Sequence, residues 1–315
     1  MTGNEIYKKI FDEAFRYLRS FEGIDDEVIS RHLNDWENTK PESILDLYTQ
    51  MLVSISNKRN MKKTIGPIEN IRPFLEDFSP KRIVERYDGD WEELFNTIKN
   101  NYDSPGRMEI DNPRSYWVIF CKSVISSSGF FSRFSNLEEF DNFVSQFYLN
   151  EYTRVALPLL LEKEIFGLGF ILACDFLKEN GYPKFIKPDT HTKKIFEGTG
   201  ISDSDSDYNI FKDLIRFCED IDELPYRVDK LFGLVGSGQF YLDEIKIDTD
   251  PDWFIEKINQ KIENGIFEAE NDTIKENTAY PVPDTVQEVD NPSPSKSILD
   301  KIRDATLKFL ERFRR

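Results

Sequence analysis

Two glycines and an aspartate at a fixed spacing are the residues of this chain best suited to do chemistry. The stretch GLGFILACDFLKENGYPKFIKPDTH places Gly167 and Gly169 before an apolar helical pattern and carries Asp189 near its end. The glycines allow a tight turn, and a helix that begins there presents unpaired N–H groups that can bind phosphate without a basic side chain. A fixed carboxylate such as Asp189 can stabilise developing positive charge or orient an attacking water molecule.

Helical patterns flank the glycines on both sides. YTRVALPLLLEKEIF ends at the Gly-Leu-Gly turn, and residues 170–180 form a second apolar pattern that Gly181 ends as a C′ residue. Two helices joined by so short a turn predict a helix-hairpin-helix. Simpler interpretations stay open, because Gly-x-Gly is also a common structural turn. An aspartate that follows Lys-Pro and precedes a helix is also a standard N-cap.

The rest of the body shows helical periodicity almost throughout. Apolar residues recur at three- and four-residue spacing, and sustained alternation with a period of two is absent. We therefore predict an all-α fold. The further helical stripes are 6–18, 41–55, 92–99, 115–127, 136–149, 209–219 and 226–235.

Composition shifts divide the chain into four segments. Residues 1–38 are an N-terminal helical segment, and residues 39–250 are the main body. Residues 251–295 are acidic and rich in Pro and Asn, which predicts a flexible linker. Residues 296–315 recover an apolar stripe among basic residues and predict an amphipathic helix. We expect that helix to dock on this protein's own body, on a protein partner or on a second copy.

Charge and composition exclude several classes of protein. The net charge of −17 argues against binding nucleic acid through bulk electrostatics. No apolar run reaches the roughly 20 residues that span a bilayer, and the first residues lack a signal-peptide pattern. We therefore expect a cytoplasmic protein that does not use a membrane. Three scattered cysteines and two histidines indicate reduced core thiols, with no metal site and no cofactor.

The spacing of Gly167, Gly169, Ala173 and Asp189 resembles that of the helix-hairpin-helix DNA glycosylase superfamily, whose fold is endonuclease-III-like. The similarity covers roughly residues 40–240 and is specific only over 165–196, which indicates a divergent member. It implies a two-lobed helical body, duplex DNA with a modified or damaged base as the partner, and Asp189 as the catalytic residue. A base must leave the stack before its glycosidic bond can be cleaved.

Further site residues follow from the hairpin and from the resemblance. The backbone-binding set is Gly167, Leu168, Gly169, Phe170 and Ile171. Candidate DNA contacts are Asn57, Lys58, Arg59, Lys187 and His191, with Asn57 or a neighbour filling the gap left by a flipped base. A candidate base pocket is lined by Tyr116, Trp117, Phe130 and Phe131. Core packing explains most of these rings equally well, and Lys187 can be a solvated lysine.

Three departures from the superfamily bear on the reaction. Phe166 stands where a proline is usual, Ile171 stands where backbone-cleaving members have a lysine, and the iron–sulfur cysteines are missing. The resemblance therefore implies a monofunctional glycosylase without a cluster, acting in repair or in defence against modified foreign DNA. Two other hypotheses remain. One is a non-catalytic helix-hairpin-helix module that binds DNA or protein, and the other is an adaptor that works through its C-terminal helix.

Overall fold

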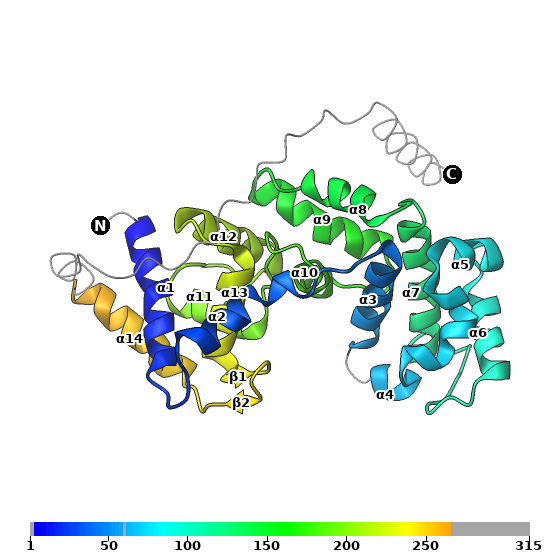
Figure 1. Cartoon of the computed structure of the whole chain (residues 1–315), viewed down its shortest axis with the longest axis horizontal. Coiled ribbons are helices and arrows are strands. Elements are labelled where there is room, and N and C mark those ends of the chain that lie inside the picture. The colour runs from blue at the N-terminus through cyan, green and yellow to red at the C-terminus, as the bar shows by residue number, and fades with distance from the viewer. Residues whose placement is uncertain (1–2, 59–60, 266–315) are drawn as a thin grey trace. The chain divides into compact units, whose positions relative to one another are not determined.

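The computed structural model describes residues 3–58 and 61–265 and is helical throughout, apart from one antiparallel pair of two-residue strands (Figure 1). The all-α prediction is confirmed. The strands are β1 (Gln239–Phe240) and β2 (Ile245–Lys246). None of the helices in this part of the chain has the length and hydropathy needed to span a bilayer.

One group of helices packs around α7 (Tyr116–Phe131). Its apolar side chains point in nearly every direction, so the helix is buried on most of its surface. Helices α3, α5 and α6 pack directly on it, and η2 packs on those three. The members of this group are α3 (Ile44–Ser56), α4 (Met61–Ile65), η2 (Ile68–Phe78), α5 (Pro80–Tyr87), α6 (Trp91–Asn101) and α8 (Leu137–Ser145).

A second group packs around α13 (Pro225–Ser237). Residues such as Val228, Leu231 and Phe232 bury one side of α13 against α1, α2, α11 and α12. The members of this group are α1 (Gly3–Arg19), α2 (Asp26–Asn34), η1 (Asp35–Glu37), α11 (Thr190–Gly198), α12 (Asp207–Asp220) and α14 (Pro251–Glu263).

Helices α9 (Glu151–Glu164) and α10 (Phe170–Glu179) touch both groups. They pack on each other, α9 also packs on α7 and α12, and α10 also packs on α3 (Figure 1). The turn between α9 and α10 is therefore fixed from both sides. This arrangement is the helix-hairpin-helix that the glycines predicted.

The expected segment boundaries need two corrections. The helices α1 and α2 lie within the predicted N-terminal segment, but α1 packs on α12, α13 and α14 within the same compact unit as the body. Where the linker was expected to begin, the chain forms α14, which Asp250 caps and which buries Phe254 and Ile258. This segment carries a short apolar stripe that the acidic composition of the residues after it does not share. The rest of the expected linker and the predicted helix at 296–315 lie outside the described residues.

The boundary of the folded body can be tested by truncation. A chain that ends at Gly265 should unfold within a few degrees of the full-length protein, because it keeps every described element. A chain that ends at Thr249 loses the burial of Phe254 and Ile258, each of which contributes roughly 1.5–3 kcal/mol. Thermal unfolding followed by circular dichroism would compare the three proteins. Equal stability of the two truncated chains would show that α14 is not part of the body.

Candidate functional site

The hairpin turn occupies residues 165–169, between the end of α9 and the start of α10. The amide of Leu168 donates to the carbonyl of Ile165 at 3.2 Å, and Gly167 has a φ of +78°. A side chain at Gly167 would be strained at this φ, and its Cβ would lie 2.9 Å from Oγ of Ser123. Glycine is thus required here for both the backbone conformation and the space.

Two serines of α7 form hydrogen bonds to the backbone of the turn. Ser123 Oγ donates to the carbonyl of Phe166 at 2.6 Å, and Ser126 Oγ accepts from the amide of Phe166 at 2.9 Å. Both polar groups of the Phe166 backbone are therefore satisfied by side chains about forty positions away in sequence. No local pattern singles out these serines, because their partner lies about forty positions away in the chain.

The start of α10 presents backbone rather than side chains. Leu168 and Phe170 are buried, and Gly169, the N-cap residue, makes no capping side-chain bond. A Cβ at Gly169 would meet no atom within 4 Å, so the space beside this turn is open. The first-turn N–H groups of a helix carry a partial positive charge when no cap satisfies them. The predicted backbone-binding residues 167–171 thus lie where such a terminus is accessible.

Two lysines lie at the hairpin. Lys58 Nζ donates to the carbonyl of Gly167 at 3.2 Å. Lys122 Nζ lies 4.5 Å from the ring centroid of Trp91 and 5.6 Å from that of Phe166, which is 48% exposed. Asn57, the exposed C-cap of α3, adjoins Lys58. Arg59, another predicted DNA contact, lies outside the described residues.

Asp189 is the N-cap of α11, as the alternative interpretation of the sequence required. Its Oδ1 accepts from the amides of His191 and Thr192, both at 3.0 Å. Its own amide donates to the carbonyl of Lys187 at 2.8 Å, around the buried Pro188. Its other oxygen, Oδ2, accepts no hydrogen bond from the described residues. One oxygen therefore fixes the carboxylate, and the other stays available.

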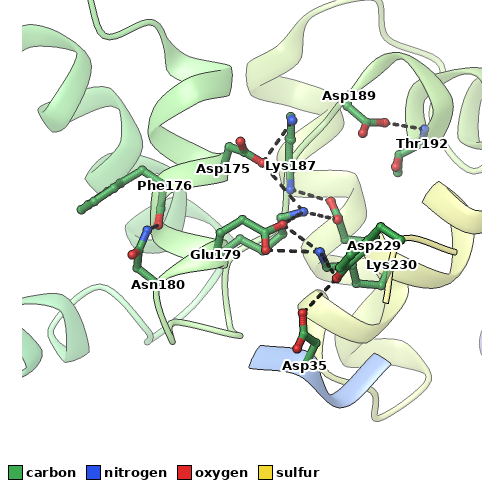
Figure 2. A network of polar contacts seen from close by, with 12 residues as sticks. Asp35, Asp175, Phe176, Glu179, Asn180, Lys187, Asp189, Thr192, Asp229 and Lys230 are labelled. Carbon is green, nitrogen blue, oxygen red and sulfur yellow. Dashed lines mark hydrogen bonds and ion pairs between the residues drawn. The ribbon is translucent and has the colours of Figure 1, made fainter. Parts of the chain in front are cut away.

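The loop that carries Asp189 is tied to α10. Lys187 Nζ pairs with Oδ1 of Asp175 at 3.1 Å (Figure 2). Asp175 lies four residues after Ile171, so both side chains project from the same face of α10. Only about 9 Å of helix axis separates Gly169 from Asp175, at 1.5 Å per residue. The Lys187–Asp175 pair therefore ties the loop that carries Asp189 to α10, the helix that begins at the hairpin.

A buried ion pair joins α10 to α13. Lys178 Nζ is 2.5 Å from Oδ2 of Asp229, and both side chains are only 5% exposed. Lys178 also pairs with Glu179 at 2.8 Å, and Lys230 of α13 approaches the same Glu179 carboxylate at 2.9 Å. Figure 2 shows Glu179, Asp229 and Lys230 converging between the two helices.

The pKa shifts in this network have opposing causes. Burial alone would lower the pKa of Lys178, but Asp229, Glu179 and Asp175 together raise it well above its ordinary value. Burial raises the pKa of Asp229, which Lys178 opposes, and the nearby charge of Asp189 raises it further. Burial would also raise the pKa of Glu179, but Lys178 and Lys230 outweigh it and lower the pKa to about 2. The carboxylates around Lys178 therefore favour its protonated, cationic form.

The remaining predicted residues divide between surface and core. His191 is exposed, and its Cβ packs over Gly236 of α13. The base pocket expected at Trp117, Phe130 and Phe131 is contradicted, since these rings are at most 2% exposed and pack in the core. The physical reason is that α7 is central to its helical group. Tyr116, the fourth residue of that set, is half-buried at the start of the helix.

Residues that could hold a metal ion are not gathered anywhere in the described ranges, where no three His, Cys, Asp or Glu side chains cluster suitably. All three cysteines are buried free thiols, and burial raises the pKa of each.

Comparisons with known proteins give one distant structural likeness. No protein-family model matches the chain, and no curated protein matches its sequence. Among solved structures, the chain is similar to an 8-oxoguanine glycosylase/lyase of Methanocaldococcus jannaschii in complex with a 15mer DNA containing 8-oxoguanine. The identity is 16%, the TM-score is 0.40, and the match covers 70% of this chain and 95% of that one. A likeness of this degree leaves the assignment of function to the site's own residues.

The two hairpin glycines should differ sharply when substituted. Gly167→Ala places a Cβ at a positive φ and against Ser123, so it should destabilise the fold by about 1–3 kcal/mol. Position 169 has a φ of −89° and open space beside it, so Gly169→Ala should destabilise the fold by less than about 1 kcal/mol. Urea unfolding of both variants would measure the difference. Equal losses of stability would mean that the turn conformation described above is wrong.

Proposed function

We propose that this protein is a DNA glycosylase that hydrolyses the N-glycosidic bond of a flipped, damaged or modified base. The observation that carries the proposal is the placement of Asp189. Its carboxylate is fixed by one oxygen at the N-terminus of α11, on a loop tied through Lys187 and Asp175 to the helix that begins at the hairpin. A phosphate-binding helix terminus and a preorganised carboxylate are the two parts that this reaction needs.

DNA would be held mainly through backbone amides at the start of α10. An uncapped helix N-terminus attracts phosphate even in a protein with a net charge of −17. Lys58 and Lys122 would add two cations beside the turn, and Asn57 would be the residue nearest to the gap left by the flipped base. Binding of this kind should weaken only modestly with salt, because few side-chain cations would neutralise phosphates and release counterions.

The reaction would proceed through a sugar with cationic character. As the bond between C1′ and the base breaks, its electron pair leaves with the base, and positive charge develops on the sugar ring. Oδ2 of Asp189 would stabilise that charge and accept a proton from the water molecule that attacks C1′. The leaving base takes up a proton, and the proton that Asp189 takes from water is returned to solvent, so that the products are the protonated free base and an abasic site. A damaged base in repair and a modified base in foreign DNA are both compatible with this reaction.

Asp189→Asn tests the catalytic role without removing the cap. Asparagine caps helices as well as aspartate does, so folding should be nearly unchanged. Loss of the negative charge should lower single-turnover base release by roughly 10²–10⁴-fold, the range for removing a general acid–base group. A panel of duplexes with damaged and hypermodified bases, scored for abasic sites, identifies the substrate on which the two proteins are compared.

Gly169→Asp is the complementary variant. A carboxylate beside the uncapped amides should repel phosphate and weaken DNA affinity before it changes the rate from the bound complex. If Asp189→Asn instead keeps full base release, Asp189 is only a cap. The chain is then a helix-hairpin-helix module that binds DNA or protein, an alternative favoured by the complete capping geometry of Asp189.

The enzyme should stop at the abasic site. Ile171 cannot form a Schiff base, Lys178 is buried among carboxylates, and Lys187 is paired with Asp175. A lysine nucleophile must be neutral to attack the sugar aldehyde. Borohydride reduction during turnover should therefore trap no covalent protein–DNA adduct. An adduct that Lys187→Ala abolishes would establish lyase activity through that lysine.

A further inference from the structure

The loop between α10 and α11, residues 180–189, is fastened to α13 at two points. The amide of Tyr226 donates to the carbonyl of Pro183 at 2.9 Å. Nearer to Asp189, the amide of Lys187 donates to Oδ1 of Asp229 at 3.0 Å (Figure 2). The first contact is between two backbones. The second depends on the identity of one side chain, which therefore controls the end of the loop that carries the proposed catalytic carboxylate.

The two oxygens of Asp229 have separate tasks. Oδ2 meets the ammonium of Lys178, and Oδ1 accepts the backbone amide of Lys187. The residue Asp229 is only 4% exposed, so its carboxylate is buried. A buried charge needs both a counter-ion and hydrogen bonds to be tolerated. Lys178 makes the buried carboxylate possible, and the carboxylate in turn fixes the loop.

The distance between the anchor and Asp189 is short. Lys187 and Asp189 are two residues apart, which is at most about 7 Å of extended chain. Pro188 between them is buried, and the amide of Asp189 donates back to the carbonyl of Lys187. Because this turn is tight, we expect that a displacement of the Lys187 amide would displace the Asp189 carboxylate by a similar distance. A misplacement of about 1 Å at a reacting group can cost about 100-fold in rate.

We propose that Asp229 is a positioning residue for Asp189, acting through the Lys187 amide, and that Lys178 serves as its counter-ion. This inference rests on the proposed function, because it assigns a role in placing the proposed catalytic group. Asp229 itself does not touch substrate. Its contribution is geometric, so it should affect the rate of the chemical step and not the affinity for DNA.

Two double variants separate the anchor from the ion pair. Asp229→Asn with Lys178→Met removes both charges but keeps an oxygen that can accept from Lys187. Asp229→Leu with Lys178→Met removes the charges and the acceptor. Each leaves one buried polar group without a partner, the Asn amide in the first and the Lys187 amide in the second, so their stabilities should be close. A buried ion pair can often be replaced in this way without loss of folding.

The Asn double variant should retain single-turnover base release within about threefold of the wild type. Single-turnover base release by the Leu double variant should be roughly 100-fold slower than that of the wild type, and its Kd for DNA should be unchanged. Amide hydrogen exchange at Lys187 should stay slow in the Asn variant and become fast in the Leu variant. Equal rates of base release in the two variants, or slow exchange at Lys187 in both, would overturn the proposal.

If the Leu double variant does not fold, the Asn double variant is sufficient to test the proposal. It must retain both slow exchange at Lys187 and base release, and loss of either contradicts the anchor. Failure of the proposed function gives a different result. In that case Asp189→Asn retains activity, while exchange at Lys187 still reports on whether Asp229 holds the loop.

Discussion

The buried pairing of Asp229 with Lys178 is the interaction on which the rest of the site depends. Two charges taken out of water are costly unless their remaining polar atoms are satisfied. Here Glu179 and the Lys187 amide complete the set, so that α10, α13 and the loop before α11 meet at one carboxylate. The helix that begins at the hairpin and the loop that carries Asp189 cannot move independently while this pairing holds.

An acidic protein that binds DNA faces an electrostatic conflict, and the hairpin suggests how it would be resolved. Leu168 and Phe170 face inward and anchor the turn, which leaves the backbone amides of α10 as the exposed polar groups. The cations nearby are already engaged, Lys58 with a carbonyl and Lys122 with two rings. Attraction would then be local to the turn, while the net charge of −17 opposes non-specific binding.

What the sequence predicted well is what depends on neighbouring residues. The hairpin follows from Gly167, Gly169 and the apolar periods beside them, and the capping of α11 follows from Asp189 and the amides that come directly after it. The Lys178–Asp229 pair joins residues 51 positions apart, so no local pattern reveals it. The aromatic rings of α7 were misassigned for the same reason, because only the tertiary packing makes that helix central. The α14 helix was assigned to the linker although its own sequence is nearly neutral, because its apolar stripe buries just two residues.

The capping role of Asp189 is compatible with a chemical role for the same side chain. A catalytic carboxylate must be held in one orientation before substrate arrives, and the amides of His191 and Thr192 do this through a single oxygen. The N-terminal end of α11 favours negative charge at this position. Asp229 holds the segment just before Asp189 through the Lys187 amide. In the proposed reaction, the cap would orient the carboxylate, the anchor would place it, and Oδ2 would face the sugar.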